Sequence, residues 1–180
     1  MAKPVFSAVA AVTLDGRIAA HPGQNTTWTS LEDKKFLHRF LDQSDVILVG
    51  HATYQIAKSS LLKRNCIVLT SKARRTNRKT LKTLFVNPKS VKLIDLIKQL
   101  GYKKIAVLGG QKIYSFCLQR GLLDELYLTI EPIVFGQGLG LFELKRFKQS
   151  QKFKLAGIRK LNSQGSILLH YKLLTKHLTG

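Results

Sequence analysis

Acidic residues are scarce in this sequence. Ten Asp and Glu stand against 30 Lys and Arg in 180 residues, which gives a formal net charge of +20, and acids are absent from 46–94 and from 144 onward. A field of this sign favours anionic partners, namely nucleotides, phosphorylated metabolites or nucleic acid. The basic run 72–82 has no aromatic residue among its Lys and Arg, although a single-strand-binding surface needs aromatic side chains for base stacking. Nucleic acid is therefore disfavoured, and solvated lysines on outer faces explain the charge equally well.

Cysteines, histidine clusters and long apolar runs are lacking as well. Cys66 and Cys117 each stand alone in an apolar run, which excludes a disulfide framework or a CxxC pair and is typical of buried free thiols. The five His show no metal-ligand spacing, so no metal site is expected. No apolar stretch approaches the roughly 20 residues of a membrane span, and the first residues lack a signal-peptide pattern. We therefore expect a cytoplasmic protein without a membrane segment.

What the sequence does have is an alternation of short apolar runs and helical patterns, typical of one α/β domain spanning 1–180. Hydrophobic residues make up 44%, enough for a sizeable core. The expected helices are 31–43, capped by Ser30, then 52–58, 91–100, capped by Ser90, and 111–120. The expected strands are 5–12, 17–19, 46–49, 66–70, 84–87, 104–108, 125–134, 153–158 and 166–174. A turn at 162–165 joins the last two, so the pattern predicts a mixed, mostly parallel sheet with a C-terminal antiparallel hairpin.

A pair of glycines, Gly109 and Gly110, joins one expected strand directly to the first turn of a helix. Unpaired backbone N–H groups and the helix dipole attract phosphate at such a position, and glycine lets the ligand approach the backbone closely. Tight turns also use glycine for packing alone. The motif by itself therefore leaves a phosphate site and a packing turn as alternatives.

Five stretches extend the context of this turn: 14–18, 28–33, 45–54, 107–114 and 121–136. Together they resemble the dihydrofolate-reductase-like superfamily, and within it the reductase domain of the bacterial riboflavin-biosynthesis deaminase/reductase. The resemblance covers nearly the whole chain in the right order. It implies a three-layer α/β/α fold of dihydrofolate-reductase-like topology.

The resemblance also implies NADPH as the cofactor. Gly109 and Gly110 match the glycine pair that cradles the pyrophosphate in that family, often through a cis bond. Hydroxyls with a cationic side chain suit the additional phosphate that distinguishes NADPH from NADH; Thr70, Ser71 and Lys72, with Arg74 or Arg75, match the positions that grip it. The remaining cofactor positions that the resemblance implies are Ala10 and Ile18 along the nicotinamide, Gly50 and Thr53 at a second nucleotide turn, and Lys112, Ile113 and Tyr114 after the glycine pair.

On the substrate side, Asp33 matches the single carboxylate of the pterin pocket, five residues after Trp28, and Thr129 matches the hydroxyl that supports it. One acid in a mostly apolar pocket can have its pKa raised by desolvation and can orient an aminopyrimidine ring through paired hydrogen bonds. The alternative for Asp33 is a helix-capping acid beside Ser30.

The implied reaction is reduction of an aminopyrimidine ribosyl phosphate to its ribityl form, as in the 5-amino-6-(5-phosphoribosylamino)uracil reductase of riboflavin synthesis. One departure bears on the substrate: the stretch 54–63 does not contain the Asp-(Asp/Asn)-Pro-x-Leu-Thr loop that helps bind the ribose phosphate. A dihydrofolate or dihydropterin reductase is therefore the first alternative, and a non-catalytic, basic nucleic-acid-binding protein on the same fold is the second. Relatives of the riboflavin type are often dimers, so a homodimer is expected.

Overall fold

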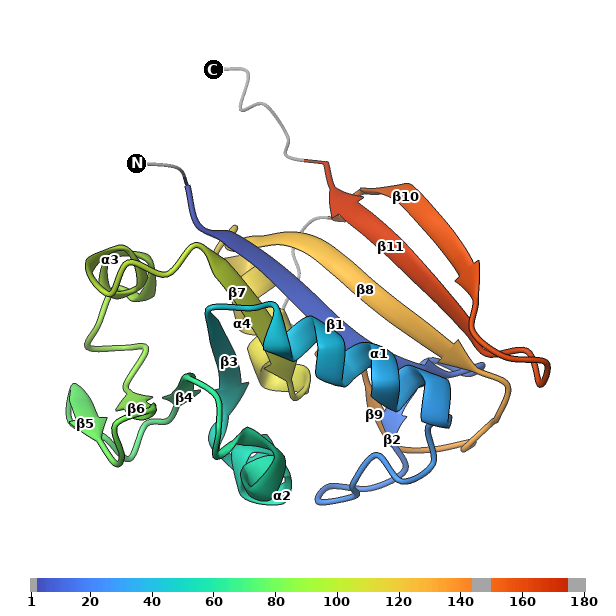
Figure 1. The fold of residues 1–180 in the computed structure, drawn as a ribbon, viewed down its shortest axis with the longest axis horizontal. Helices are drawn as coiled ribbons and strands as arrows, with labels where there is room; N and C mark the ends of the chain where they lie inside the picture. Colours follow the sequence, from blue (N-terminus) through green and yellow to red (C-terminus); the bar gives the residue numbers. More distant parts are fainter. Residues whose placement is uncertain (1–2, 144–149, 175–180) are drawn as a thin grey trace.

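A nine-stranded sheet forms the centre of the molecule in the computed structural model, which describes residues 3–143 and 150–174 (Figure 1). The order across the sheet is β10-β11-β8-β1-β7-β3-β4-β6-β5, and β2 and β9 form a separate two-stranded sheet. The strands are β1 (Val5–Thr13), β2 (Arg17–Ala19), β3 (Val46–Gly50), β4 (Cys66–Leu69), β5 (Thr76–Arg78), β6 (Thr83–Val86), β7 (Lys104–Gly109), β8 (Leu123–Glu131), β9 (Leu139–Gly140), β10 (Phe153–Lys160) and β11 (Ile167–Leu173). The helices are α1 (Leu31–Asp42), α2 (His51–Leu61), α3 (Leu93–Gln99) and α4 (Gln111–Gln119).

The six central strands run parallel. β1 pairs in parallel with β7 and β8, and the parallel pairing continues from β7 through β3 and β4 to β6. β11 pairs antiparallel with β8, and β10 with β11. The expected mostly parallel sheet with a C-terminal hairpin is confirmed, and the carboxyl ends of the parallel strands meet along one edge, where ligands of open α/β sheets bind.

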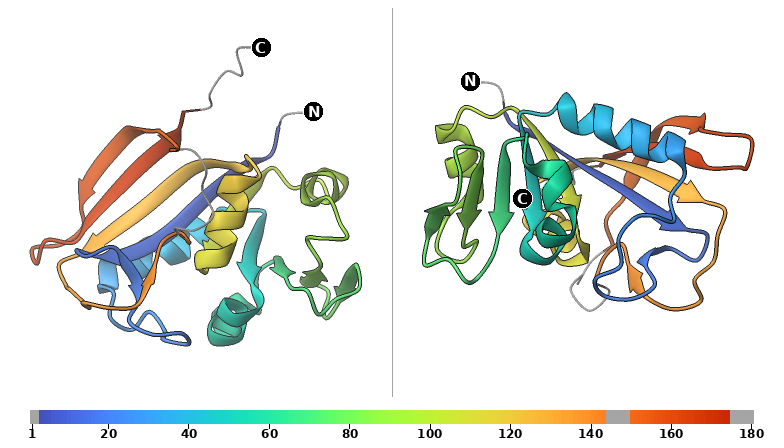
Figure 2. Two further views of the ribbon diagram at one scale, coloured as in Figure 1. Left: turned by 180° about the vertical axis from the view of Figure 1, so that it is seen from behind. Right: turned by 60° about the horizontal axis from the view of Figure 1, so that its bottom comes forward.

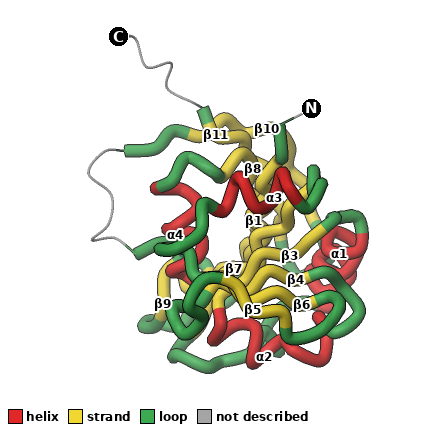
Figure 3. The backbone as a smooth tube through the Cα atoms, turned by 90° about the vertical axis from the view of Figure 1, so that its left-hand side faces the viewer, coloured by secondary structure: helices red, strands yellow, loops and turns green. Residues whose placement is uncertain are grey.

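Two helices cover each face of the sheet (Figures 2 and 3). One core holds Leu41 of α1 and Tyr54 and Leu61 of α2, packed on side chains such as Val49. The other core holds residues of α3 and α4, among them Ile97 and Cys117. This is the three-layer α/β/α arrangement that was expected, because parallel strands need apolar cover on both faces.

Several element bounds differ from the sequence expectations. α3 begins at Leu93 with Lys92 as its N-cap, so Ser90 is not the cap; residues 88–90 form a turn instead. β8 ends at Glu131 rather than at 134, because Pro132 cannot donate to the ladder. β5 and β9 were not expected. Each is very short. The three residues of β5 are polar and exposed, so the sequence shows no apolar alternation there.

Both cysteines are free and buried, as expected of core thiols. Among the described helices, none combines the length and the apolar character that crossing a bilayer requires.

Candidate functional site

Two helices begin side by side at the carboxyl edge of the sheet. α4 follows β7 with Gly110 as its N-cap, and α2 follows the neighbouring strand β3 with Gly50 as its N-cap. Neither N-cap makes a side-chain hydrogen bond, and neither first turn contains an acid. The N–H groups and the positive dipole ends of both helices are therefore left for an anion.

Glycine allows these two turns to approach each other closely. A Cβ added at Gly110 would lie 3.1 Å from Thr53 Oγ1, and one added at Gly50 would lie 2.9 Å from Ile113 Cγ1. The peptide bond between Gly109 and Gly110 is cis, as the resemblance implied. The structure thus brings together Gly50, Thr53, Gly110 and Ile113 from two separate sequence motifs, with the exposed Lys112 in the first turn of α4.

Tyr114 connects the glycine turn with β1. Gly109 has φ +94°, and a Cβ there would lie 2.7 Å from the Tyr114 ring, so the ring packs directly on the glycine backbone. The Tyr114 hydroxyl donates to the Val9 carbonyl at 2.7 Å. Burial raises the pKa of Tyr114, and the nearby Asp33 carboxyl raises it further. Tyr114 is therefore a neutral hydrogen-bond donor that links the turn, β1 and the surroundings of Asp33.

The third strand end contributes a basic turn. Thr70 follows β4 and is buried, and its Oγ1 accepts a hydrogen bond from the Lys72 backbone N–H at 3.2 Å. Ser71 and Lys72 are exposed, as are Arg74 and Arg75. Thr70 therefore shapes the turn, whereas the side chains of Ser71 and Lys72 are the ones that a ligand can reach.

Asp33 is a buried acid, with only 6% of its surface exposed. Desolvation raises its pKa, hydrogen bonds from the Thr129 and Thr29 hydroxyls oppose that rise, and the neighbouring Glu131 carboxylate adds to it. Thr129 is itself buried on β8. Thr129 is thus close enough to Asp33 to act on its pKa, and the roles of the pair stay a prediction.

The carboxyl of Asp33 does not serve as the helix-capping acid. The Ser30 side chain caps α1 by accepting from the Asp33 backbone N–H at 3.2 Å. In a capping box the acid would accept in return from the Ser30 N–H, but that N–H donates to Glu131 Oε1 at 2.8 Å. The Asp33 carboxyl is therefore free of the capping role, and Thr129 and Thr29 act on its pKa.

Ala10 and Ile18 lie on the first two strands. Ala10 is in β1, paired with Leu128 of β8, and Ile18 is the half-buried middle residue of β2. The loop between these strands is fixed by Asp15, which accepts from the Gly136 N–H at 2.9 Å. A Cβ at Gly138 would overlap the Ala19 carbonyl, so the segment before β9 packs tightly against β2.

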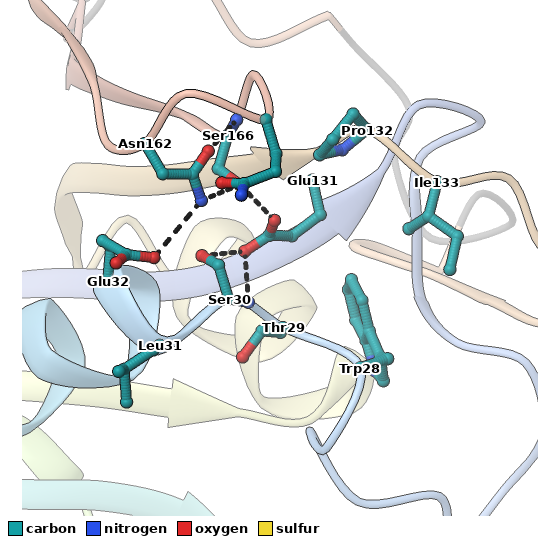
Figure 4. A pocket seen from close by; sticks show the side chains of 11 residues that line it. Trp28, Thr29, Ser30, Leu31, Glu32, Glu131, Pro132, Ile133, Asn162 and Ser166 are labelled. Atoms are coloured by element: carbon teal, nitrogen blue, oxygen red, sulfur yellow. Dashed lines mark hydrogen bonds between the residues drawn. The ribbon is translucent and has the colours of Figure 1, made fainter.

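Sequence reasoning did not identify Glu131. Its side chain is 4% exposed and accepts hydrogen bonds at both carboxylate oxygens, from Ser30 and from Ser166, as Figure 4 shows. It borders a cavity of about 390 Å³ between Trp28, Ile133 and the hairpin turn. Its position two residues after Thr129 on β8, hence on the same face, was the signal available.

No group of three or more His, Cys, Asp or Glu within 3–143 and 150–174 is arranged to hold a metal ion.

The family model described as the RibD C-terminal domain matches residues 4–66 and 59–166, and the chain belongs to this family. It is 27% identical over 166 residues to the Bacillus subtilis protein YyaP, described as uncharacterized, covering 85% of this chain and 87% of that one.

Among solved structures, Acinetobacter baumannii RibD superposes with a TM-score of 0.76 at 18% identity, covering 96% of this chain and 59% of that one. A dihydrofolate reductase from Enterococcus faecalis, complexed with NADP(H), superposes with a TM-score of 0.65 at 18% identity, covering 96% and 98%. These structures establish the dihydrofolate-reductase-like fold.

Proposed function

We propose that the protein is an NADPH-dependent reductase of a pyrimidine or pterin-like substrate, with the riboflavin-type aminopyrimidine ribosyl phosphate as the first candidate. The observation that carries this proposal is the connection between an anion-binding turn and a buried acid. Tyr114 packs on Gly109 of the turn and lies within the electrostatic reach of Asp33. The anion-binding turn and the protonatable group thus lie on either side of Tyr114, an arrangement that supports a reductase.

The part of the carboxyl edge that holds Gly50, Gly109 and Gly110, here called the glycine edge, fits a dinucleotide. Two uncapped helix N-termini at adjacent strand ends offer backbone N–H donors to a pyrophosphate. A Cβ added at Gly110 would contact Thr53 Oγ1, so a residue larger than glycine at this position would fill the space that the phosphate needs. We assign the pyrophosphate to Gly50, Thr53, Gly109 and Gly110, with Lys112 as a nearby cation.

Preference for NADPH over NADH is assigned to the turn after β4. Ser71, Lys72, Arg74 and Arg75 are exposed, and 46–94 contains no acid that would repel a phosphate. A hydroxyl with ammonium and guanidinium groups matches the charge and the acceptor oxygens of a 2′-phosphate. Thr70 supports this turn from below through its bond to the Lys72 N–H.

When bound, NADPH would supply a hydride. A dihydropterin accepts it at a ring carbon–nitrogen double bond, and the ribosylamino group accepts it once its sugar ring has opened to the imine, so in both candidate reactions one proton must reach the nitrogen. The raised pKa of Asp33 allows this side chain to retain a proton. Its protonated carboxyl and the Thr129 hydroxyl can bind the ring of an aminopyrimidine or pterin by paired hydrogen bonds. The chain's part is to orient the ring, to exclude water and to hold the proton at the Asp33 carboxyl.

A dihydropterin reductase is the second candidate, and one observation favours it. In riboflavin-type reductases a loop at this place helps bind the ribose phosphate of the substrate, whereas here helix α2 continues through the stretch to Leu61. A dihydropterin has no ribose phosphate and does not need that loop. Lys58, Ser59 and Ser60 of that helix and Lys63 beyond it are exposed. The alternative of a nucleic-acid-binding protein has no comparable support, because it gives no role to a buried acid.

A homodimer is proposed on the edge strand β10. Leu155 is 42% exposed and Ile158 is 65% exposed on this strand, which has an open hydrogen-bonding edge in the described chain. Such an edge is a template for pairing with a second chain. Light scattering should give twice the monomer mass; a monomer at micromolar concentration would contradict the proposal.

Turnover distinguishes the two substrates. NADPH oxidation is followed at 340 nm with the aminopyrimidine ribosyl phosphate and with dihydrofolate, for the wild type and for Asp33→Asn. Turnover of the first compound supports the riboflavin-type activity, and turnover of the second alone reverses the order of the candidates. Absence of NADPH oxidation with both compounds, in a protein that binds NADPH, would refute both.

A further inference from the structure

Glu131 is a buried charged side chain that the proposed reaction does not itself use. It lies at the end of β8, two residues after Thr129, and its burial is almost complete. The cost of burying a carboxylate is offset here by hydrogen bonds at both oxygens. Oε1 accepts from the Ser30 backbone N–H at 2.8 Å and from the Ser30 Oγ at 2.7 Å, and Oε2 accepts from the Ser166 Oγ.

These bonds connect Glu131 to Asp33 through the first turn of α1. The Asp33 backbone N–H donates to Ser30 Oγ, and the Ser30 hydroxyl donates in turn to Glu131 Oε1. The hydrogen bonds therefore form a chain in which each bond polarises the next. Thr129, which acts on the pKa of Asp33, lies on the same strand as Glu131.

The far side of Glu131 is tied to the C-terminal hairpin. Ser166 also accepts from Asn162 Nδ2 at 3.0 Å, and the same amide nitrogen donates to Glu32 Oε2 at 3.3 Å (Figure 4). Glu32 and Asp33 are neighbours in the first turn of α1. The hairpin turn and β8 thus hold this helical turn at two points, the Ser30 cap and the Glu32 side chain.

We propose that Glu131 is a positioning residue for Asp33: it fixes the first turn of α1 from β8 and keeps a second buried carboxylate beside the proton that Asp33 holds. This inference rests on the proposed function for its catalytic meaning, because Asp33 is the proposed proton-holding group. The groups that act on the pKa of Asp33 are Thr129 and Glu131 on β8, Thr29 before α1 and Lys34 on α1, and Asp33 in turn acts on the pKa of Tyr114 on α4. Glu131 is the neighbour among them whose negative charge opposes ionisation of Asp33.

The test uses Glu131→Gln, which keeps the size and an accepting oxygen but removes the charge. The matched control is Glu125→Gln on the same strand; the Glu125 carboxylate accepts from Ser7 and Tyr127 and is not among the groups that act on Asp33. Titration of the Asp33 carboxyl is followed by ¹³C NMR in the ligand-free protein, with Asp33→Asn to assign the signal. Glu131→Gln should move the titration midpoint of Asp33 to lower pH, and Glu125→Gln should leave it in place.

The alkaline limb of the pH–rate profile should move in the same direction in Glu131→Gln, because Asp33 then loses its proton at lower pH. Glu131→Ala removes the Ser30 acceptor as well, so amide exchange in the first turn of α1 should quicken, and Glu131→Gln should restore the protection. If Glu131→Ala does not fold, the titration of Glu131→Gln still decides. An unchanged Asp33 midpoint in Glu131→Gln, or an equal shift in Glu125→Gln, would overturn the proposal. Failure of NADPH to bind would refute the proposed function and leave this titration readable.

Discussion

Replacing Gly109 by Ala should destabilise the protein strongly, for two reasons that can be separated. Gly109 has φ +94°, where an L-residue costs about 1 kcal/mol or somewhat more. The added Cβ would also lie 2.7–2.8 Å from two ring carbons and the hydroxyl oxygen of Tyr114. That ring is 4% exposed and its hydroxyl is bonded to Val9, so it cannot move aside without losing the bond and its rotamer. These losses are worth about 2 kcal/mol together.

The expected total for Gly109→Ala is therefore about 3 kcal/mol of unfolding free energy, or about 9 °C in Tm for a chain of this size. Gly101→Ala is the matched control: φ is +76° and no atom lies within 4 Å of the added Cβ. It should lose the backbone contribution alone, about 1 kcal/mol or about 3 °C. Urea and thermal unfolding measure both variants. Equal losses in the two would refute the packing of Tyr114 on the glycine turn.

Three further predictions concern the site and the core. Gly110→Val should fold but lose NADPH binding, since its side chain would enter the space beside Thr53 Oγ1, and calorimetry showing wild-type affinity in a folded variant would remove the pyrophosphate assignment. Asp33→Asn should lose turnover yet gain stability. The pKa of Asp33 is raised in the folded protein, so ionisation of this carboxyl at higher pH destabilises the folded state of the wild type, and Asn does not ionise. The gain in Tm should therefore be larger at neutral pH than below the ordinary Asp pKa of 3.8, and a gain confined to acidic pH would contradict the assigned direction. Burial raises the pKa of Cys66 to about 11, so a disulfide reagent at pH 8 should react with it only after denaturation; rapid labelling of the folded protein would show the thiol to be accessible.

The fold could be predicted from local patterns because most elements carry their own signals. Ser30 was identified as the cap of α1 from the chemistry of its side chain, and the structure confirms it. The Ser90 prediction used the same chemistry and was wrong, because the turn at 88–90 delays the helix to Leu93. Local propensity cannot include the turn geometry that tertiary packing selects. β5 and β9 were missed because two or three residues give no periodicity.

The candidate site was predictable where a motif matched a family and unpredictable where contacts join distant segments. The resemblance implied that Asp33 and Thr129 act together; Thr129 does act on the pKa of Asp33, and the roles of the two residues stay a prediction. Glu131 was missed because its partners, Ser30 and Ser166, lie 101 and 35 residues away in the sequence. Thr70 is predicted to bind phosphate, and its oxygen also accepts from the Lys72 N–H in its own turn, a bond that the sequence did not indicate. Residue type indicates what a side chain can bond, and only the fold shows which partner it has.

Nicotinamide cofactor binding tests the central claim most directly. The wild-type protein is titrated with NADPH and with NADH while thermal unfolding is followed, beside a charge-removing variant, Lys72→Gln. At an NADPH concentration about 100 times its Kd, binding should add about 2.7 kcal/mol of stability, which is about 8 °C in Tm. NADH should stabilise much less, and Lys72→Gln should reduce the difference between the two cofactors. If neither cofactor stabilises the wild-type protein, the glycine edge is not a dinucleotide site and the reductase assignment falls.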